Sequence, residues 1–534
     1  MRTLYRAARV HQPTDAPGHP PATALVVDDT TIRWIGPAPD VPGPVDRTVD
    51  LGDALITPGF VDAHLHVTET GLLLRGLDLR TARSVTEILH RVADAAHHTD
   101  THLILGHGWD DTLLAEHRPP TRTELDHAAE GRPVYLSRID VHSAIVSTAL
   151  AEACGAPARD GWSADGRVER DAHHAARDAT RHHLTGPQRR AVQRDALTHA
   201  AAHGVVAVHE MSSPHLVPDD DPRHLLAVIA HAAAQGPVAA GPLAGLGQAL
   251  PAVTLYHATL VQTAEQAQDV ATRLGVPLAG LAGDLCVDGS VGSRTAAFTA
   301  PYTDAPGHHG HQYLSTDQIR DHVAACTRAG LQAGFHAIGD AAVHTVRRGL
   351  RRAAEQVGIA AVRAARHRIE HVEAIDDGVA DLADLGVTAS VQPAFDAHWG
   401  GPDGLYATRL GTARALAMNP LADLVAAGVA LVLGSDSPVT PVDPWGTLRA
   451  CLFHHVPAQR LDLRTALAAH TTGGWHLIGA DDAGHLRSGA PATFAAWWVP
   501  GGTGPDGLPT LQPGTPLPEG LLTVAGGRVL HSRL

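Results

Sequence analysis

Lysine is absent from this chain of 534 residues, so its 41 basic side chains are all arginines. Any chemistry that depends on a lysyl amine is therefore excluded. Alanine is abundant beside the arginine, a combination that indicates a GC-rich coding sequence rather than a structural requirement. The missing amine becomes important below, at one position of the candidate site.

Cysteines and long apolar runs are also scarce. No apolar run approaches the roughly 20 residues that a membrane span requires. The first residues, 1–6, include basic side chains but no apolar segment follows them, so we expect a cytoplasmic protein without a membrane partner. The four cysteines form no C-x-x-C pair and are interpreted as reduced core thiols rather than as a disulfide framework or a zinc ribbon: Cys154, Cys286, Cys326 and Cys451.

The charge balance gives no sign of a polyanionic partner. The formal net charge is -15, but the 38 histidines add roughly +9 at pH 7 and bring the net charge to about -6. A chain of this charge is not expected to bind nucleic acid or an anionic membrane. With 44% apolar and 18% charged residues, the composition is that of a soluble globular protein. We expect its partner to be a small-molecule substrate. The sequence leaves the oligomeric state open, and a homo-oligomer is possible.

Short β-type runs mark both ends of the chain. Residues 25–27 and 31–35 flank a turn-forming Asp28-Asp29-Thr30, and residues 521–524 and 528–530 flank Ala525-Gly526-Gly527. Both patterns predict hairpins, and residues 495–499 predict a further strand. Neither end can bury a core alone. We therefore predict one small β-sandwich built from residues 1–57 and 485–534.

The middle of the chain alternates short apolar strands with helical stretches rich in Ala and Arg. This alternation predicts parallel strands and, at this length, a (β/α)₈ barrel over residues 58–484. Residues 70–200 are too many for one β/α unit, so we expect an insertion or lid there. The expected helices are 85–96, 187–202 and 316–329, and the expected strands are 103–105, 134–136, 205–208, 253–255, 333–335, 387–391 and 430–433.

Histidines and an aspartate stand at strand ends. His64 and His66 lie two apart on a strand that follows a Pro-Gly turn, so both side chains share one face. His336, His371 and Asp436 each end a short apolar strand, and such ends converge at the active-site face of a barrel. A single histidine of this kind is more often a satisfied, half-buried residue, but the whole set favours a metal site. Imidazoles with a carboxylate suit zinc or another borderline first-row metal.

Several motifs together resemble the amidohydrolase superfamily, and most closely its YtcJ-like, amidohydrolase 3 branch. The resemblance spans nearly the whole chain and implies a metal-dependent hydrolase, with a (β/α)₈ barrel and a flanking β-sandwich. It places His64 and His66 on barrel strand 1, His336 on strand 5, His371 on strand 6 and Asp436 on strand 8. The motifs are residues 55–66 (LITPGFVDAHLH), 108–113 (GWDDTL), 137–143 (SRIDVHS), 288–296 (DGSVGSRTA), 336–340 (HAIGD), 368–371 (RIEH) and 434–439 (GSDSPV).

One departure from the family concerns the bridging ligand. Many members carry a lysine four residues before the Asp-Gly of the 288–296 motif, and its carboxylated side chain bridges two metals. Here that position is Asp284, so a carboxylated lysine is excluded. An aspartate carboxylate sits about 5 Å closer to the backbone than a lysyl carbamate. We therefore expect one zinc per chain, held by His64, His66 and Asp436 together with His336, while Asp284 stays a candidate ligand. Cys286 is a possible soft ligand, although a packed core thiol is the simpler interpretation.

Five residues in the family-like motifs are candidates for substrate binding: Trp109, Arg138, His142, Asp288 and Arg294. An arginine could hold a substrate carboxylate through two parallel hydrogen bonds. The alternative for Arg138 and Arg294 is a structural ion pair. The alternative for Trp109 is packing within the lid.

The predicted reaction is hydrolysis of an amide-type C–N bond by a metal-activated water. Asp436 is expected to act as the general base, and His336 and His371 to bind metal or to stabilise the oxyanion. Two alternatives remain open at this stage. One is a hydrolytic deaminase on the same scaffold, and the other is a metal-binding or regulatory homologue that has lost catalysis.

Overall fold

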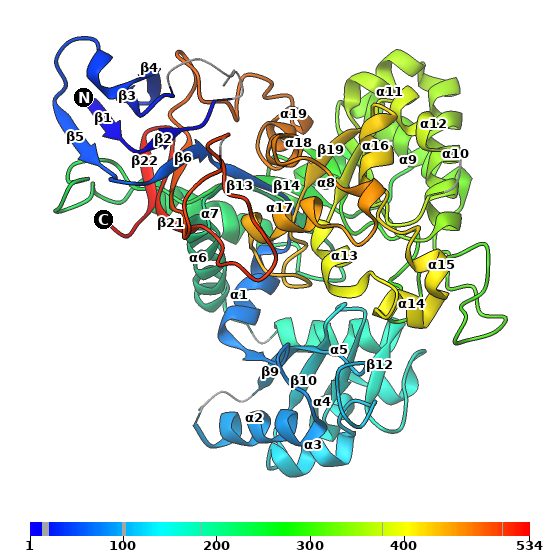
Figure 1. Ribbon diagram of the computed structural model, residues 1–534. Coiled ribbons are helices and arrows are strands. Elements are labelled where there is room, and N and C mark those ends of the chain that lie inside the picture. Colours follow the sequence, from blue (N-terminus) through cyan, green and yellow to red (C-terminus); the bar gives the residue numbers. More distant parts are fainter. Residues whose placement is uncertain (13–20, 99–102, 183, 376–377, 505) are drawn as a thin grey trace.

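Eight parallel strands form a barrel in the computed structural model, which describes residues 1–12, 21–98, 103–182, 184–375, 378–504 and 506–534 (Figure 1). The barrel closes between its first and last strands, where Leu65 bridges Ser437 and the Asp436 amide donates to the His64 carbonyl at 2.8 Å. The strands in spatial order are β7 (Phe60–Leu65), β13 (Val205–Ser212), β14 (Ala252–His257), β15 (Gly280–Leu281), β16 (Gln332–Ala337), β17 (Arg368–His371), β18 (Thr388–Val391) and β19 (Ala430–Leu433). The predicted (β/α)₈ barrel is confirmed.

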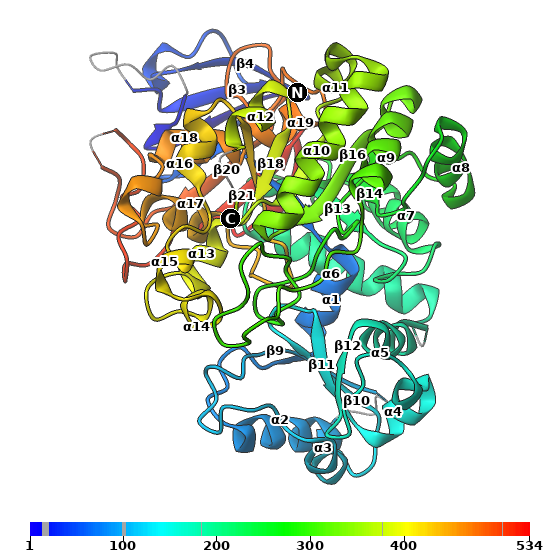
Figure 2. The same cartoon turned by 90° about the vertical axis from the view of Figure 1, so that its right-hand side faces the viewer.

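Helices cover the outside of the barrel, as Figure 2 shows for α9 and α10 beside β16. In α9 (Thr316–Ala329), Ser315 and Gln318 form a capping box and Gly330 ends the helix in the left-handed conformation. Its buried residues Ile319, Val323 and Cys326 recur at helical spacing and face the barrel. The other covering helices are α7 (Asp221–Ala233), α8 (Ala264–Leu274), α10 (Asp340–Val357), α11 (Ile359–Ala365), α12 (Val379–Asp384), α16 (Leu421–Ala426), α17 (Pro444–Leu452), α18 (Leu463–Ala469) and α19 (Thr472–Leu477).

Strands from both ends of the chain form two further sheets that share one apolar core. Both predicted hairpins are present, and Tyr5 packs edge-on against Phe494 with ring centroids 5.0 Å apart. Trp497 also donates from Nε1 to Thr57 Oγ1 at 2.9 Å. One sheet runs β4 (Thr31–Gly36), β3 (Ala24–Asp28), β1 (Arg2–Arg6), β5 (Arg47–Asp50), and the other β2 (Arg9–Val10), β6 (Leu55–Pro58), β20 (Phe494–Trp498), β21 (Glu519–Ala525), β22 (Arg528–Ser532).

A separate lobe is inserted between the first and second barrel strands, and it forms the lower part of Figure 1. The chain leaves the barrel through α1 (Val67–Arg75) and returns through α6 (Gly186–Ala202). The expected strands 103–105 and 134–136 belong to this lobe and not to the barrel. Its sheet consists of β8 (Leu77–Asp78), β9 (Ile104–Trp109), β10 (Val134–Arg138), β11 (Ser143–Val146) and β12 (Arg167–Glu169), and its helices are α2 (Val85–His98), α3 (Arg122–Ala128), α4 (Thr148–Cys154) and α5 (Arg170–His182).

Short helices near the barrel mouth complete the fold: α13 (Pro393–Trp399), α14 (Leu405–Leu410) and α15 (Thr412–Ala415). Three single-turn 3-10 helices lie at η1 (Ala38–Asp40), η2 (Ala156–Ala158) and η3 (Pro457–Gln459). Among the described residues, the helices are all too short or too polar to cross a membrane.

Candidate metal centre

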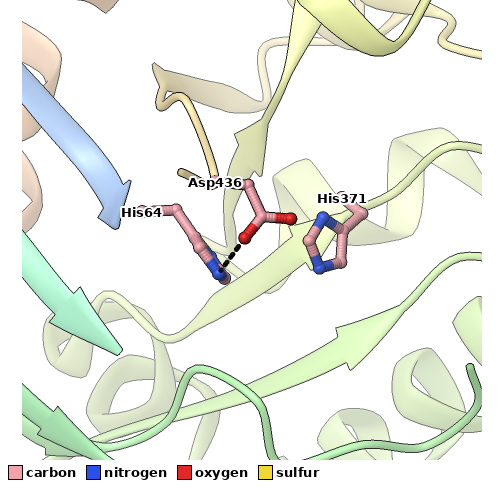
Figure 3. A group of neighbouring side chains, drawn as sticks. All are labelled: His64, His371 and Asp436. Carbon is pink, nitrogen blue, oxygen red and sulfur yellow. Dashed lines mark ion pairs between the residues drawn. The ribbon is translucent and has the colours of Figure 1, made fainter. Parts of the chain in front are cut away.

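Five of the predicted ligands meet at the carboxyl-terminal end of the barrel. His64 and His66 lie at the end of β7, His336 lies in β16, His371 ends β17 and Asp436 follows β19. All five side chains are buried. Figure 3 shows His64 and His371, from two barrel strands, and Asp436, from the loop after β19, pointing towards a common centre.

The carboxylate of Asp436 stands between the two imidazoles of β7. Its Oδ1 lies 3.3 Å from Nε2 of His64 and 3.2 Å from Nε2 of His66. The side chain of His371 completes a compact group with His64 and Asp436, whose donor atoms all lie within 4.8 Å of one another. Nitrogen and oxygen donors at such spacing can surround one cation.

Oxygen acceptors fix the outer nitrogens of all four histidines. Nδ1 of His371 contacts Gln392 Oε1 at 2.7 Å. Nδ1 of His64 contacts Glu370 Oε2 at 2.9 Å, Nδ1 of His66 contacts the Met211 carbonyl at 3.1 Å, and Nε2 of His336 contacts the Gly289 carbonyl at 3.3 Å. In the neutral imidazole, each outer nitrogen then carries the proton and the inner nitrogen is free to bind a metal. This arrangement is typical of metal-binding histidines.

Glu370 is the main support that the sequence analysis did not assign. Its carboxylate is buried and is held by Arg368, which donates from Nη2 at 2.9 Å and also reaches the Ala63 carbonyl and Ser390. The ion pair therefore fixes the position of the carboxylate that orients His64. The only sequence signal for this role is the position of Glu370 directly before the predicted ligand His371.

The charges at the centre show that a cation fits there. Burial opposes a charge on His64, but the carboxylates of Asp436 and Glu370 outweigh it and raise the pKa of His64 well above its usual value. Burial would raise the pKa of Asp436, yet the neighbouring His64 holds it well below its usual range. His64 Nε2 is buried without a hydrogen-bond partner. The carboxylates thus stabilise positive charge at the centre of the group. A divalent metal would supply that charge in place of the protons on the histidines.

Asp284 reaches the same centre, although its side chain is short. Its carboxylate oxygens lie 3.8 Å from His64 Nε2, 3.4 Å from His66 Nε2 and 3.9 Å from His336 Nδ1. Asp284 forms one ligand group with His64 and His66 and a second with His336 and His371. Asp284 therefore lies where a metal ligand would be, and its role as a ligand stays a prediction.

A local turn explains this reach. The β15 ladder breaks after Leu281, and Gly283 has a φ of +88°, a conformation that favours glycine. A Cβ at Gly283 would lie 2.9 Å from the sulfur of Met211, so the chain passes close to β13 here. Pairing with β16 resumes at Cys286, which bridges His336. The bulged segment brings Asp284 towards the mouth of the barrel.

Two candidate catalytic residues have unusual backbone conformations. His371 has a φ of 74° and Asp436 a φ of 53°, both in the left-handed region. Such conformations cost free energy in residues other than glycine and are concentrated at functional sites. They direct the side chain of His371 inwards at the last residue of β17, and that of Asp436 inwards just beyond β19.

Cys286 lies beside the centre without joining a ligand group. Burial raises the pKa of its thiol well above the usual value, and the carboxylates of Asp284 and Asp288 act in the same direction. The thiol contacts the main-chain oxygen of Asp284 at 3.4 Å. None of the three-residue ligand groups in the described part of the chain includes it. The interpretation as a protonated thiol is the better one.

A cavity of about 620 Å³ opens onto the metal centre. Barrel residues such as Asp284, His336 and Asp436 line one part of it, and residues of the inserted lobe line the opposite part. His142 comes from the lobe, and its ring lies 5.5 Å from that of His336. Burial and the nearby His336 lower the pKa of His142 to about 4, so its side chain is neutral. His142 lines the cavity, so its position suits a contact with substrate, and that contact remains a prediction.

Arg138 and Trp109 do not have the positions expected of substrate-binding residues. Arg138 is buried and contacts three carboxylates, those of Asp110, Asp111 and Asp140, at 2.9–3.2 Å. Trp109 is also buried and donates from Nε1 to the Leu136 carbonyl at 2.8 Å. Neither side chain lines the cavity. Both therefore stabilise the inserted lobe, which corrects the expected roles.

Arg294 and Asp288 are likewise committed to internal contacts. Arg294 binds Asp304 through two hydrogen bonds of 2.7 and 3.0 Å and lies outside the cavity lining, so the structural ion pair is the correct alternative. Asp288 lines the cavity, but its carboxylate accepts backbone N–H groups of Ile338, Gly339 and Ala297 at 2.8–3.0 Å. It fixes the loops that carry the site, and its expected contact with substrate stays a prediction.

Comparisons with known proteins agree with this site. The model of the Amidohydrolase family matches residues 47–530. The putative amidohydrolase YtcJ of Bacillus subtilis is 25% identical over 79% of this chain and 78% of its own. The N-substituted formamide deformylase of Arthrobacter pascens is 24% identical over 79% of this chain and 78% of its own. A crystal structure of an uncharacterized metal-dependent hydrolase from Pyrococcus furiosus is 25% identical, with a TM-score of 0.68 over 93% of this chain and 98% of that one.

Proposed function

We propose that this chain, which belongs to the amidohydrolase family and is a metal-dependent hydrolase, hydrolyses an amide-type C–N bond of a small molecule. The observation that carries the proposal is the convergence of four histidines, whose outer nitrogens are held by oxygen acceptors, with Asp436 and Asp284 beside a cavity. The similarity to a formamide deformylase favours an amide over other hydrolysable bonds.

Zinc is the metal that the ligand set suits best, because imidazoles and carboxylates at this spacing match its preferences. His64, His66, Asp436 and Asp284 would hold a tightly bound ion. His336, His371 and Asp284 offer a second, less complete set of ligands. When bound, such an ion supplies Lewis-acid chemistry, polarising a carbonyl group and lowering the pKa of water.

Asp436 is the proposed general base. Its carboxylate is ionised because its pKa lies well below the usual range, and it faces the cavity. In this role it accepts a proton from the attacking water and later delivers it to the leaving nitrogen. The surrounding histidines keep the carboxylate oriented during both transfers.

His371 and His336 are proposed as metal ligands rather than as oxyanion donors. Nε2 of His371 lies 3.0 Å from Nδ1 of His336. The outer nitrogen of His336 faces a carbonyl and therefore carries the proton of the neutral ring. The inner nitrogen is protonated only when the ring is positively charged, which a bound cation would prevent. The two inner nitrogens therefore face one another across a position that suits a cation.

The test combines metal analysis with a substrate panel. Purified protein would be assayed against amides, N-formyl amines and amino-heterocycles, with amine and ammonia release measured separately. Release of an amine from amides supports the proposal. Ammonia release from amino-heterocycles alone would identify a deaminase, and bound metal without turnover of any compound would favour a regulatory homologue.

A further inference from the structure

One arginine of the inserted lobe faces the cavity without an acidic partner. Arg177 lies on α5, its residue is only 7% exposed, and it lines the same cavity as His66, Asp284 and Asp436. The figures show α5 on the side of the lobe that faces the barrel (Figures 1 and 2). An arginine buried to this degree normally has a carboxylate partner.

The contacts of Arg177 leave most of its hydrogen-bonding capacity unused. Its Nη2 donates to the Val141 carbonyl and lies 3.4 Å from Nδ1 of His173. Among the described residues, no acceptor lies within hydrogen-bonding distance of its Nε or Nη1, and no carboxylate forms an ion pair with it. Its positive charge is therefore not neutralised locally.

The nearby carboxylates are engaged elsewhere. Glu69 binds Arg181 of the same helix through both of its oxygens, and Asp160 binds Arg170 at 2.7 Å. Asp171 is exposed and lies about 9 Å from Arg177 along the helix axis. Asp171 also lines the cavity. Of the three arginines that line it, Arg177 is the one without a carboxylate partner among the described residues.

The histidines beside Arg177 do not add to its charge or cancel it. Burial, reinforced by Arg177 itself, lowers the pKa of His174 to about 3 and that of His173 well below its usual value. His173 is also held by the Tyr135 hydroxyl at 2.7 Å. These neutral side chains form a fixed wall around one cation.

We propose that Arg177, on the wall of the cavity that the inserted lobe contributes, binds an anionic group of the substrate. The cavity surface also includes apolar side chains, among them Leu72, Leu105, Leu216 and Leu314. The substrate class is therefore an amide with an apolar arm that ends in a carboxylate, which a guanidinium can bind through two hydrogen bonds. This inference rests on the proposed function for the position of the scissile bond.

Equilibrium binding tests the anchor without requiring turnover. The probes are ω-acetamido carboxylates of increasing chain length, each paired with its neutral terminal amide, and binding to the metal-loaded protein is measured by calorimetry. We expect at least one carboxylate to bind about tenfold or more tightly than its neutral partner, as hydrogen bonds between charged groups allow. If no carboxylate in the series binds more tightly than its partner, the proposal is overturned.

Variants assign the preference to the side chain. Arg177→Met should abolish the preference, and Arg177→Lys should retain part of it through one charged donor. The matched control is Arg167→Met, an arginine of the same lobe that binds Glu169 at 2.6 Å and lies outside the cavity. A preference that survives Arg177→Met in folded protein would refute the anchor. If the wild-type protein prefers the carboxylate probes but hydrolyses no C–N bond, only the proposed reaction is refuted.

Discussion

Oδ2 of Asp284 lies 3.4 Å from Nε2 of His66, at the position where many relatives would place a carboxylated lysine. The same carboxylate faces His336 on the other side of the centre. One short side chain therefore belongs to two ligand groups. Unlike a lysyl carbamate, it needs no carbon dioxide to form, so assembly of the centre should depend on metal alone.

The Asp284→Ala variant tests this arrangement. We expect wild-type protein to retain about one tightly bound metal per chain after removal of free metal, with activity unaffected by bicarbonate. The variant should bind that metal more weakly, because it removes a carboxylate that belongs to two of the ligand groups. Elemental analysis provides the measurement, with the exposed Asp269→Ala as control. Full metal retention by Asp284→Ala would remove Asp284 from the ligand set.

Replacing the proposed base should affect turnover more than folding. For Asp436→Asn we expect activity to fall by at least about a hundredfold, because the amide cannot accept the proton. Steady-state kinetics measures the effect, and metal content is determined in parallel to separate base loss from ligand loss. Asp423→Asn, on an exposed helix, is the control. Activity within a few-fold of wild type would show that another group is the base.

The Glu370→Gln variant removes the carboxylate that orients His64. We expect metal affinity to fall about 10- to 100-fold, the usual effect of losing such a partner. The variant also leaves Arg368 buried without its counter-charge, which should cost about 3–5 kcal/mol of stability. Chelator competition and thermal unfolding of metal-free protein measure the two effects separately. Glu355→Gln on the surface of α10 should change neither.

Acid should weaken the inserted lobe through Asp140. Burial favours the neutral form, but Arg138 and His142 outweigh it and lower the pKa of Asp140 to about 2. Relative to an unfolded pKa of about 3.9, the stabilisation is on the order of 2 kcal/mol. It is complete above pH 4 and is lost as the pH falls towards 2.

Thermal unfolding of Asp140→Asn at several pH values checks this prediction. The variant should be less stable than wild type above about pH 4, and the difference should shrink as the pH falls towards the pKa of about 2. The control is Asp482→Asn, whose carboxylate is 96% exposed in its pair with Arg487. A difference in stability that is unchanged down to pH 2 would contradict the assignment.

Deletion of residues 490–534 tests the sheets built from both chain ends. It removes β20, which pairs with β6, and exposes the apolar side chains that surround Tyr5. We expect most of the truncated protein to be insoluble. The soluble fraction on expression is the measurement, and a soluble truncation that unfolds at the wild-type temperature would contradict the shared core.

The sequence predicts the barrel and the ligand positions because those signals are local. A Pro-Gly turn, an alternating strand and the pair His64 and His66 lie within one short segment. The strand signal does not specify which sheet a strand joins, so it does not by itself assign residues 103–105 and 134–136 to the barrel or to the expected insertion. Their place in the inserted lobe depends on contacts distant in sequence.

Partners far apart in sequence also explain the errors in the substrate site. The motif around Arg138 resembles the family, but its neutralisation by Asp110 and Asp111 appears only in the fold. For Arg177 the sequence misleads in the other direction. The helical spacing of Arg170, Arg177 and Arg181 is typical of a solvent-exposed helix face, so no signal distinguishes Arg177 as a binding residue. Only the structure shows that two of these arginines are paired and one is not.

The hydrogen bond between Trp497 and Thr57 joins residues 440 positions apart. During synthesis at about 5–20 residues per second, the strands near Thr57 leave the ribosome roughly 20–90 seconds before their partners. Throughout that interval their apolar faces cannot be covered by the native neighbours. The newly made chain is therefore expected to need chaperone protection at its leading end, and the shared core can form only after nearly all of the polypeptide has been translated.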